Sequence, residues 1–313
     1  MLLMIGGKHM NQSNHISPQK GVLFGLIAVA IWTGFILVSR AGALSHLEMA
    51  DLVAVRFGTA LIVLSPLVWK FRKQWLQPRM FVLGSIGGLA YAVSVYSGFA
   101  RAPASHAALL LPGLMPIVIA VLASLMLKET KSATTWIGIS LSSVGVMVLI
   151  LESLLDSREY LGGDLLFVLA CIFWAIYTVL LRQWKLQPWP ATVIVVAVAS
   201  TLYLPVYIAV LPKGIFAASW QTVAVQAVYQ GIIATIVQML FYVRAVQAIG
   251  PTRMGALMAL VPVMASVLAV PLFGESVSLG ATIGIMLGGF GAILAALGGN
   301  IPLFRYWISR RPA

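Results

Sequence analysis

The chain has 313 residues, of which 61% are hydrophobic and only 9% are charged, whereas about a quarter of the residues are charged in an ordinary soluble domain. This composition excludes a soluble globular protein, and the apolar segments leave no length for a soluble catalytic domain. The formal net charge of +12 would suggest nucleic acid in a soluble protein, but here it indicates basic loops on one side of a membrane.

Ten charge-poor apolar stretches predict ten transmembrane helices, each close to the roughly 20 residues that a bilayer requires. Arg56 lies inside the second stretch, and His106 lies near the start of the fourth. The predicted spans run approximately over residues 21–39, 53–69, 80–99, 104–127, 134–151, 165–181, 191–211, 223–243, 254–273 and 279–297.

Lysine and arginine are divided unequally between the alternate connections. One set, which includes both tails, holds 15 of them, the other set holds 4, and the remaining one is Arg56. Because basic connections stay in the cytoplasm, both termini are predicted to be cytoplasmic. Residues 1–20 then form a disordered cytoplasmic tail without a cleavable signal, 153–163 an outer loop, and 299–313 a basic cytoplasmic tail.

The two halves of the chain, residues 21–152 and 164–298, resemble each other. Trp32 and Arg40 recur 142 residues later as Trp174 and Arg182. Four further residues recur at an offset of 146: Pro116, Glu129, Gly138 and Gly145 match Pro262, Glu275, Gly284 and Gly291. Because five is odd, the second half enters the membrane from the opposite side. The predicted fold is therefore an all-α integral membrane protein with ten transmembrane helices arranged as two inverted five-helix repeats.

An inverted repeat favours a transporter, because two pseudo-symmetric halves can exchange conformations around a substrate site near the midplane. An old gene duplication in a static membrane protein is the alternative.

The repeated pattern resembles the EamA-type transporters of the drug/metabolite transporter superfamily from about Gly21 to Leu297. The first repeat carries the resemblance in Arg56-Phe57, Ala100 to Leu110, Pro116, Glu129, Gly138 and Gly145. The second carries it in Ala248-Ile249-Gly250-Pro251, Pro262, Glu275, Gly284 and Gly291. The resemblance implies a carrier of the bacterial inner membrane, often an exporter of amino acids or other small metabolites. It also implies a central cavity lined by spans one, three, four, six, eight and nine. Span seven departs from the pattern, because it has no counterpart of Arg56.

The predicted function is secondary transport of an amino acid or related compound by alternating access, in the efflux direction. The alternatives are export of amphipathic drugs, export of nucleotide or sugar metabolites, and an integral-membrane transferase. No enzyme, cofactor, metal or nucleic-acid partner is predicted; in particular, none of the four histidines lies within four residues of another. The expected partners are a small-molecule substrate and the lipid bilayer. A monomer or weak homodimer is expected, since the stripe Gly280, Gly284 and Gly288 can pack on span five.

Aromatic residues near the predicted midplane are the first candidates for the substrate site. Trp32 lies 12 residues after Lys20, about 18 Å along a helix, and Trp174 occupies the equivalent place in the second half. Tyr177 follows Trp174 one turn later, and Tyr91 lies on span three. An aromatic-walled cavity suits apolar, aromatic or cationic substrates, but helix packing explains the same residues.

Span eight is the most polar span. Gln238 and Tyr242 share a face with Gly231 and Thr235 at spacings of 4, 3 and 4. These side chains either line the cavity or form hydrogen bonds between helices.

Two titratable residues and two prolines complete the candidates. Arg56 either has a structural role, with a stem that reaches the interface near Asp51 and Glu48, or binds a substrate carboxylate. His106 either couples transport to protons or is a hydrogen-bonded residue near the membrane surface. Pro116 and Pro262 are expected to kink spans four and nine, either as hinges or simply to shape the bundle. Spans one and six carry no internal carboxylate, which favours downhill transport or exchange.

Overall fold

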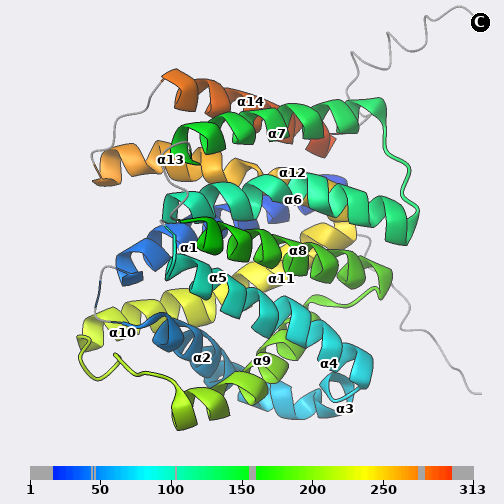
Figure 1. The fold of residues 1–313 in the computed structure, drawn as a ribbon. Helices are drawn as coiled ribbons and strands as arrows, with labels where there is room; N and C mark the ends of the chain where they lie inside the picture. The colour runs from blue at the N-terminus through cyan, green and yellow to red at the C-terminus, as the bar shows by residue number, and fades with distance from the viewer. Residues whose placement is uncertain are drawn as a thin grey trace, which may run out of the picture.

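The computed structural model describes residues 17–43, 45, 47–102, 104–154, 160–273 and 279–297, and all regular elements in these ranges are helical (Figure 1). The first-half elements are α1 (Pro18–Ala43), α2 (Met49–Lys70), α3 (Arg72–Trp75), α4 (Pro78–Gly84), η1 (Ser85–Ala90), α5 (Tyr91–Phe99), α6 (Ala104–Leu127) and α7 (Ala133–Leu154). The second-half elements are α8 (Leu161–Gln183), α9 (Pro188–Val210), α10 (Trp220–Gln226), η3 (Ala227–Val237), α11 (Gln238–Ile249), α12 (Pro251–Met258), α13 (Leu260–Phe273) and α14 (Leu279–Leu297). The predicted tail 299–313 and Glu275 lie outside the described residues.

Within the described ranges, seven helical segments are long and apolar enough to cross a membrane. They are Pro18–Ser39, Met49–Lys70, Pro78–Phe99, Leu110–Leu127, Leu161–Gln183, Pro188–Val210 and Trp220–Ile249. Two shorter apolar helices cover Pro251–Ala265 and Thr282–Ala295. A chain with so many apolar helices is an integral membrane protein.

The helices form successive layers across the bundle. In Figure 1, α7 and α14 lie side by side at one edge, and α6, α12 and α13 form the next layer. Helices α1, α5, α8 and α11 occupy the centre, while α2 and α9 pack together at the opposite edge. This order places the middles of α1, α5, α8 and α11 in the interior, where the largest cluster of buried side chains lies.

The closest approach of two helices is between α7 and α14. A Cβ atom added to Gly145 would lie 2.3 Å from the backbone nitrogen of Gly288, and one added to Gly291 would lie 2.3 Å from that of Ser142. Small residues permit such backbone proximity between membrane helices. The glycine stripe on α14 therefore packs within the chain, as its spacing predicted.

Three of the predicted spans are not uniform α-helices. Spans three and eight each contain a π-helical segment, η1 and η3, a feature that often occurs at functional sites. Span nine is interrupted at Ala259, between α12 and α13. Pro262 follows directly and lacks the N–H that would bond to the carbonyl of Met258. Span four, by contrast, continues as one helix through Pro116, so only Pro262 coincides with a helix interruption.

Candidate functional site

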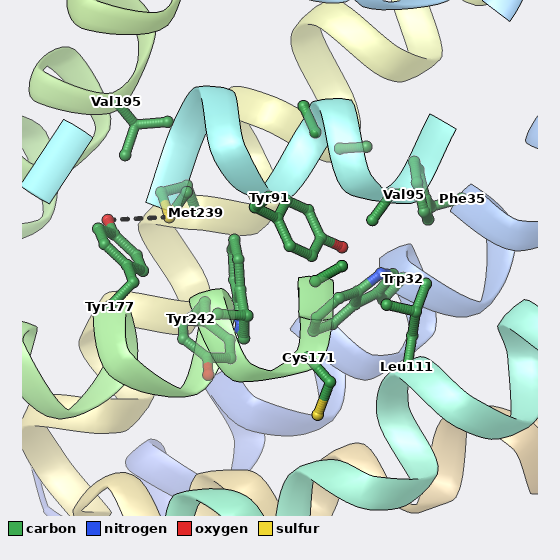
Figure 2. Packing of buried hydrophobic residues seen from close by; sticks show 14 of the residues in the cluster. Trp32, Phe35, Tyr91, Val95, Leu111, Cys171, Tyr177, Val195, Met239 and Tyr242 are labelled. Atoms are coloured by element: carbon green, nitrogen blue, oxygen red, sulfur yellow. Dashed lines mark hydrogen bonds between the residues drawn. The ribbon is translucent and has the colours of Figure 1, made fainter. Parts of the chain in front are cut away.

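Five aromatic side chains from four helices meet at the centre of the bundle. Trp32 comes from α1, Tyr91 from α5, Trp174 and Tyr177 from α8, and Tyr242 from α11, and all five are buried. We refer to these five residues as the aromatic cluster. Figure 2 shows Trp32, Tyr91, Tyr177 and Tyr242 converging from their separate helices. All the aromatic residues that the sequence analysis proposed as substrate-binding therefore lie together in one cluster.

Trp174 is the hub of the aromatic cluster. Its ring centroid lies 4.8 Å from that of Tyr91, 5.2 Å from those of Trp32 and Tyr242, and 5.4 Å from that of Tyr177. The interplanar angles of these pairs lie between 47° and 62°, as expected for tilted and edge-to-face aromatic contacts. Each such pair contributes about 0.5–1.5 kcal/mol beyond its buried area. The two tryptophans of the internal repeat therefore contact each other directly.

A small cavity of about 10 Å³ adjoins the aromatic cluster. This volume is near the lower limit of roughly 10–15 Å³ at which a cavity accommodates one water molecule. Its lining residues are Trp32, Phe35, Arg56, Tyr91, Trp174, Ala234 and Gln238. They come from α1, α2, α5, α8, η3 and α11, so both halves of the chain contribute. Among the described residues, α6, α12 and α13 contribute none, in contrast to the expectation that spans four and nine line the cavity.

Three residues that line this cavity each carry a buried side-chain donor with no hydrogen-bond partner among the described residues. The donors are Nε of Arg56, Nε1 of Trp174 and Nε2 of Gln238. These residues are 6%, 2% and 4% exposed, respectively, so bulk water does not satisfy them. A buried donor without a partner costs about 1–3 kcal/mol, and more when it is charged. Three of the seven residues around the cavity therefore carry a donor that lacks an acceptor.

Arg56 is buried, so its side chain is enclosed by the protein and does not extend into bulk water. The guanidinium carbon lies 5.4 Å from the ring centroid of Phe35 and 5.8 Å from that of Phe57, within the range of cation–π attraction. The carboxylate of Asp51, proposed as its partner, is occupied elsewhere. Asp51 accepts hydrogen bonds from the hydroxyl of Tyr207 at 2.5 Å and from the backbone N–H groups of Glu48 and Gly214 at 2.8 and 2.9 Å.

A polar network closes the bundle on the side of the cavity toward the C-terminal end of α1. The hydroxyl of Tyr96 donates to Oε1 of Gln230 at 3.3 Å, and Nε2 of Gln230 donates to Oγ of Ser39 at 3.0 Å. These two bonds connect α5, η3 and α1. Tyr96 also packs edge-to-face against Phe35, with ring centroids 6.4 Å apart. The sequence analysis did not single out Tyr96 or Gln230, because their contact joins two helices that are far apart in the sequence.

A second set of contacts closes the opposite side, between α8 and α11. The hydroxyls of Thr178 and Tyr242 are 2.7 Å apart, and Thr178 also donates to the backbone oxygen of Trp174 at 2.7 Å. Because Thr178 has one hydroxyl proton, Tyr242 is the donor in their shared bond. The hydroxyl of Tyr177 donates to the sulfur of Met239 at 3.4 Å, as the dashed line in Figure 2 shows.

His106 does not line the cavity. Its Nδ1 lies 2.8 Å from Oδ1 of Asp164, and its ring meets that of Tyr160 edge-to-face with centroids 5.5 Å apart. These contacts tie the first turn of α6 to the start of α8. The geometry matches the hydrogen-bonded interpretation of this residue.

A larger, open hollow of about 730 Å³ lies between the start of α4 and the α8–α9 connection. Three basic side chains line it, Lys73, Arg79 and Lys185, and its lining includes no carboxylate among the described residues. We call this hollow the basic vestibule. Tyr177 of the aromatic cluster lies about two turns before Gln183, which lines the hollow, and Gly87 of η1 packs directly on the Tyr177 ring.

Comparison with known proteins gives one consistent family. The chain matches the EamA-like transporter family over residues 19–151 and again over residues 161–297. It is 24% identical to the uncharacterized transporter YyaM of Bacillus subtilis (strain 168) over 263 residues, which is 78% of this chain and 83% of YyaM. The uncharacterized transporter YwfM of the same organism is 33% identical over 134 residues, or 41% of this chain and 45% of YwfM.

The fold also has a solved counterpart. A protein of known crystal structure superimposes on the chain with a TM-score of 0.67 and 20% identity, covering 92% of this chain and 99% of its own. With two family matches that together span most of its length, the chain belongs to the EamA-like transporter family and is a membrane transporter rather than an enzyme.

Proposed function

We propose that this protein is a secondary transporter that moves an amino acid or related small metabolite out of the cell by alternating access. The substrate site is the aromatic cluster with Gln238, and Arg56 and the small cavity adjoin it. The observation that carries the proposal is a small cavity between the two halves, lined by buried residues, with a separate set of hydrogen bonds on each side. Opening one set at a time would expose the cavity to one side of the membrane at a time.

Reciprocal glycine contacts support an inverted repeat. Gly145 packs on the oxygen of Gly284 and the nitrogen of Gly288, and Gly291 packs on the oxygen of Gly138 and the nitrogen of Ser142. Adding 146 to the number of Gly145 gives Gly291, and subtracting 146 from Gly284 and Gly288 gives Gly138 and Ser142. The two sets of contacts are therefore equivalent. A twofold axis that relates α7 to α14 produces this pattern.

The other helix contacts also occur in matching pairs. Helix α5 packs on α8, and α11 packs on α1; similarly, η3 packs on α2, and η1 packs on α9. If each span of the first half is replaced by the corresponding span of the second half, and the reverse, the α5–α8 contact becomes the α11–α1 contact. In the same way, the η3–α2 contact becomes the η1–α9 contact. We therefore propose ten membrane crossings, with residues 21–152 and 164–298 as the two inverted repeats and a monomer as the functional unit.

The loop charges support a cytoplasmic location for both termini, and thiol labelling tests it. Cys171 is the only cysteine and is buried, so a Cys171→Ala background gives a clean reference. Phe216→Cys and Gln77→Cys place single thiols at exposed positions near opposite ends of the bundle. In intact cells, a membrane-impermeant maleimide should label Phe216→Cys and not Gln77→Cys. The reverse pattern would require the opposite orientation.

Counterflow in proteoliposomes tests the transporter function itself. Vesicles are loaded with unlabelled amino acids, other organic anions, nucleosides, sugars or cationic drugs, and uptake of the matching labelled compound is followed. Saturable counterflow of one group would establish the carrier and its substrate class. A signal restricted to drugs, nucleosides or sugars would favour the corresponding alternative substrates, and no exchange by folded protein would contradict the proposal.

The pathway gives no support for coupling to protons. Among the described residues, the pairs Asp51 with Tyr207 and His106 with Asp164, each of which contains a carboxylate, both lie outside the cavity lining. Transport is therefore downhill or by exchange. Concentrative uptake driven by an imposed pH gradient in the same vesicles would contradict this part of the proposal.

A further inference from the structure

The unpaired donors of the cavity residues indicate the chemistry of a ligand that this site would bind. Nε of Arg56, Nε1 of Trp174 and Nε2 of Gln238 come from α2, α8 and α11, and all three belong to residues that line the same small space. Their shared need is an acceptor. A ligand group rich in oxygen lone pairs would satisfy all three, whereas an ammonium group would satisfy none.

The charge balance of the cavity also requires an anion. Arg56 is the one charged residue that lines it, and no ion pair to Arg56 is found among the described residues. Asp51, the nearest acid along the helix, already receives three hydrogen bonds. A buried guanidinium without a carboxylate is costly, and a planar carboxylate is the group that it binds best.

We propose that the central site recognises its substrate as a monocarboxylate. The carboxylate is held by Arg56, Trp174 and Gln238, and the apolar body packs on Trp32 and Tyr91. A single negative charge matches the single cation, while a phosphate dianion would leave an unbalanced charge in the buried site. This inference rests on the proposed transport function and refines it: the carboxylate is essential for recognition, and an amino group is not.

The basic vestibule is a second feature that suits an anion. Lys73, Arg79 and Lys185 line an open hollow of about 730 Å³, which also includes Gln183 at the end of the helix that carries Trp174 and Tyr177. A hollow lined by one sign of charge raises the local concentration of the opposite ion. An anionic substrate would therefore be concentrated near the end of α8, the helix that carries Trp174 and Tyr177.

Three matched probes test the inference by direct binding to the detergent-purified protein. They are 3-phenylpropionate, its amide, and 3-phenylpropylamine, which share an aromatic ring and differ in the terminal group. The carboxylate should bind at least about tenfold more tightly than the amide or the amine, as expected for a charge-assisted contact. Phenylalanine should bind no more than a few-fold differently from 3-phenylpropionate. Equal or tighter binding of the amine would overturn the inference.

Variants connect this preference to the three donors. Trp174→Phe keeps an aromatic ring but removes the N–H, and it should weaken binding of the carboxylate about tenfold more than binding of the amide. Trp220→Phe, at an exposed position, is the matched control. Arg56→Gln should abolish the preference for the carboxylate. Arg56→Lys keeps the charge and should retain part of this preference, and it replaces the glutamine variant in the test if that variant does not fold. An unchanged preference in folded Trp174→Phe and Arg56 variants would overturn the assignment.

Failure of this inference is distinguishable from failure of the proposed function. Counterflow of amines, sugars or nucleosides, without binding of 3-phenylpropionate, would overturn the carboxylate site and leave the carrier intact. Selective binding of 3-phenylpropionate without counterflow of any compound would support the site and contradict the carrier.

Discussion

Asp51 shows how one buried carboxylate can hold distant parts of the chain together. It lies in the first turn of α2 and accepts hydrogen bonds from the hydroxyl of Tyr207 on α9 and from the N–H of Gly214 in the following loop. It also accepts a bond from the N–H of Glu48, which caps its own helix. We infer that Asp51 is a structural residue rather than part of the substrate site.

This role predicts a measurable coupling between Asp51 and Tyr207. Asp51→Ala should lower the free energy of unfolding by about 2–4 kcal/mol, because it leaves three donors without their charged acceptor. Tyr207→Phe should cost less, and the double variant should cost about 1–3 kcal/mol less than the sum of the two. Thermal unfolding in detergent measures all three, with the exposed Gln221→Ala as control. Additive effects would show that the two residues act independently.

At the residue scale, the sequence was most informative where the two halves repeat each other. Trp32 and Trp174 were paired by their offset, and the structure places their ring centroids 5.2 Å apart. Arg56 was singled out as a charge in a span, but its surroundings could not be predicted. The side chains around Arg56 include Phe35 and Tyr96, which come from two other helices. Contacts between helices cannot be predicted from a local sequence pattern.

The pair α7 and α14 is the tightest contact between elements, and it makes a sharp prediction. Gly145→Ala and Gly291→Ala should each destabilise the protein by about 1–3 kcal/mol, because the new methyl group meets backbone atoms that cannot turn away. The two losses should be similar, since the contacts are reciprocal. Gly289→Ala is the control, because its Cβ would approach only side-chain atoms at 3.9 Å or more. Thermal unfolding in detergent is the measurement, and equal midpoints for all three variants would contradict the packing argument.

Pro262 gives a prediction about motion, since it follows the interruption between α12 and α13. We propose that it is a hinge, and Pro116 its counterpart within the continuous α6. Pro262→Ala restores a backbone donor and should slow counterflow several-fold, while substrate affinity stays the same. Pro112→Ala, which alters a proline without a repeat partner, is the comparison. An unchanged counterflow rate would mean that Pro262 only shapes the bundle.

At the scale of elements, hydropathy located the apolar helices well but could not predict their internal irregularities. The π-helical segments η1 and η3 sit where neighbouring helices demand space: Gly87 packs on Tyr177, and Gly231 packs on Thr59. The spacing of 4, 3 and 4 in span eight assumed an unbroken α-helix and did not allow for η3. Such departures arise from tertiary packing, so apolar periodicity does not report them.

The whole molecule carries its positive charge unevenly, and this predicts a dependence on salt. Replacing Lys73, Arg79 and Lys185 by Gln should raise the KM for an anionic solute that enters from the vestibule side and leave kcat nearly unchanged. The effect should shrink at high ionic strength, because salt screens exposed charges. Arg101→Gln with Lys213→Gln, near the opposite end, is the control. Initial rates of counterflow at two salt concentrations measure it, and an effect independent of salt would contradict electrostatic steering.

The small cavity and the three unpaired donors of its lining residues have a consequence for the rate at which the carrier changes conformation. In an occluded state without substrate, those donors stay buried and unsatisfied, at a cost of about 1–3 kcal/mol each. A bound substrate with suitable acceptors removes this cost. The empty protein should therefore cross between its two states much more slowly than the loaded one. The protein would then act mainly as an exchanger. Export of one solute would be limited by the supply of a second solute that can be carried inward.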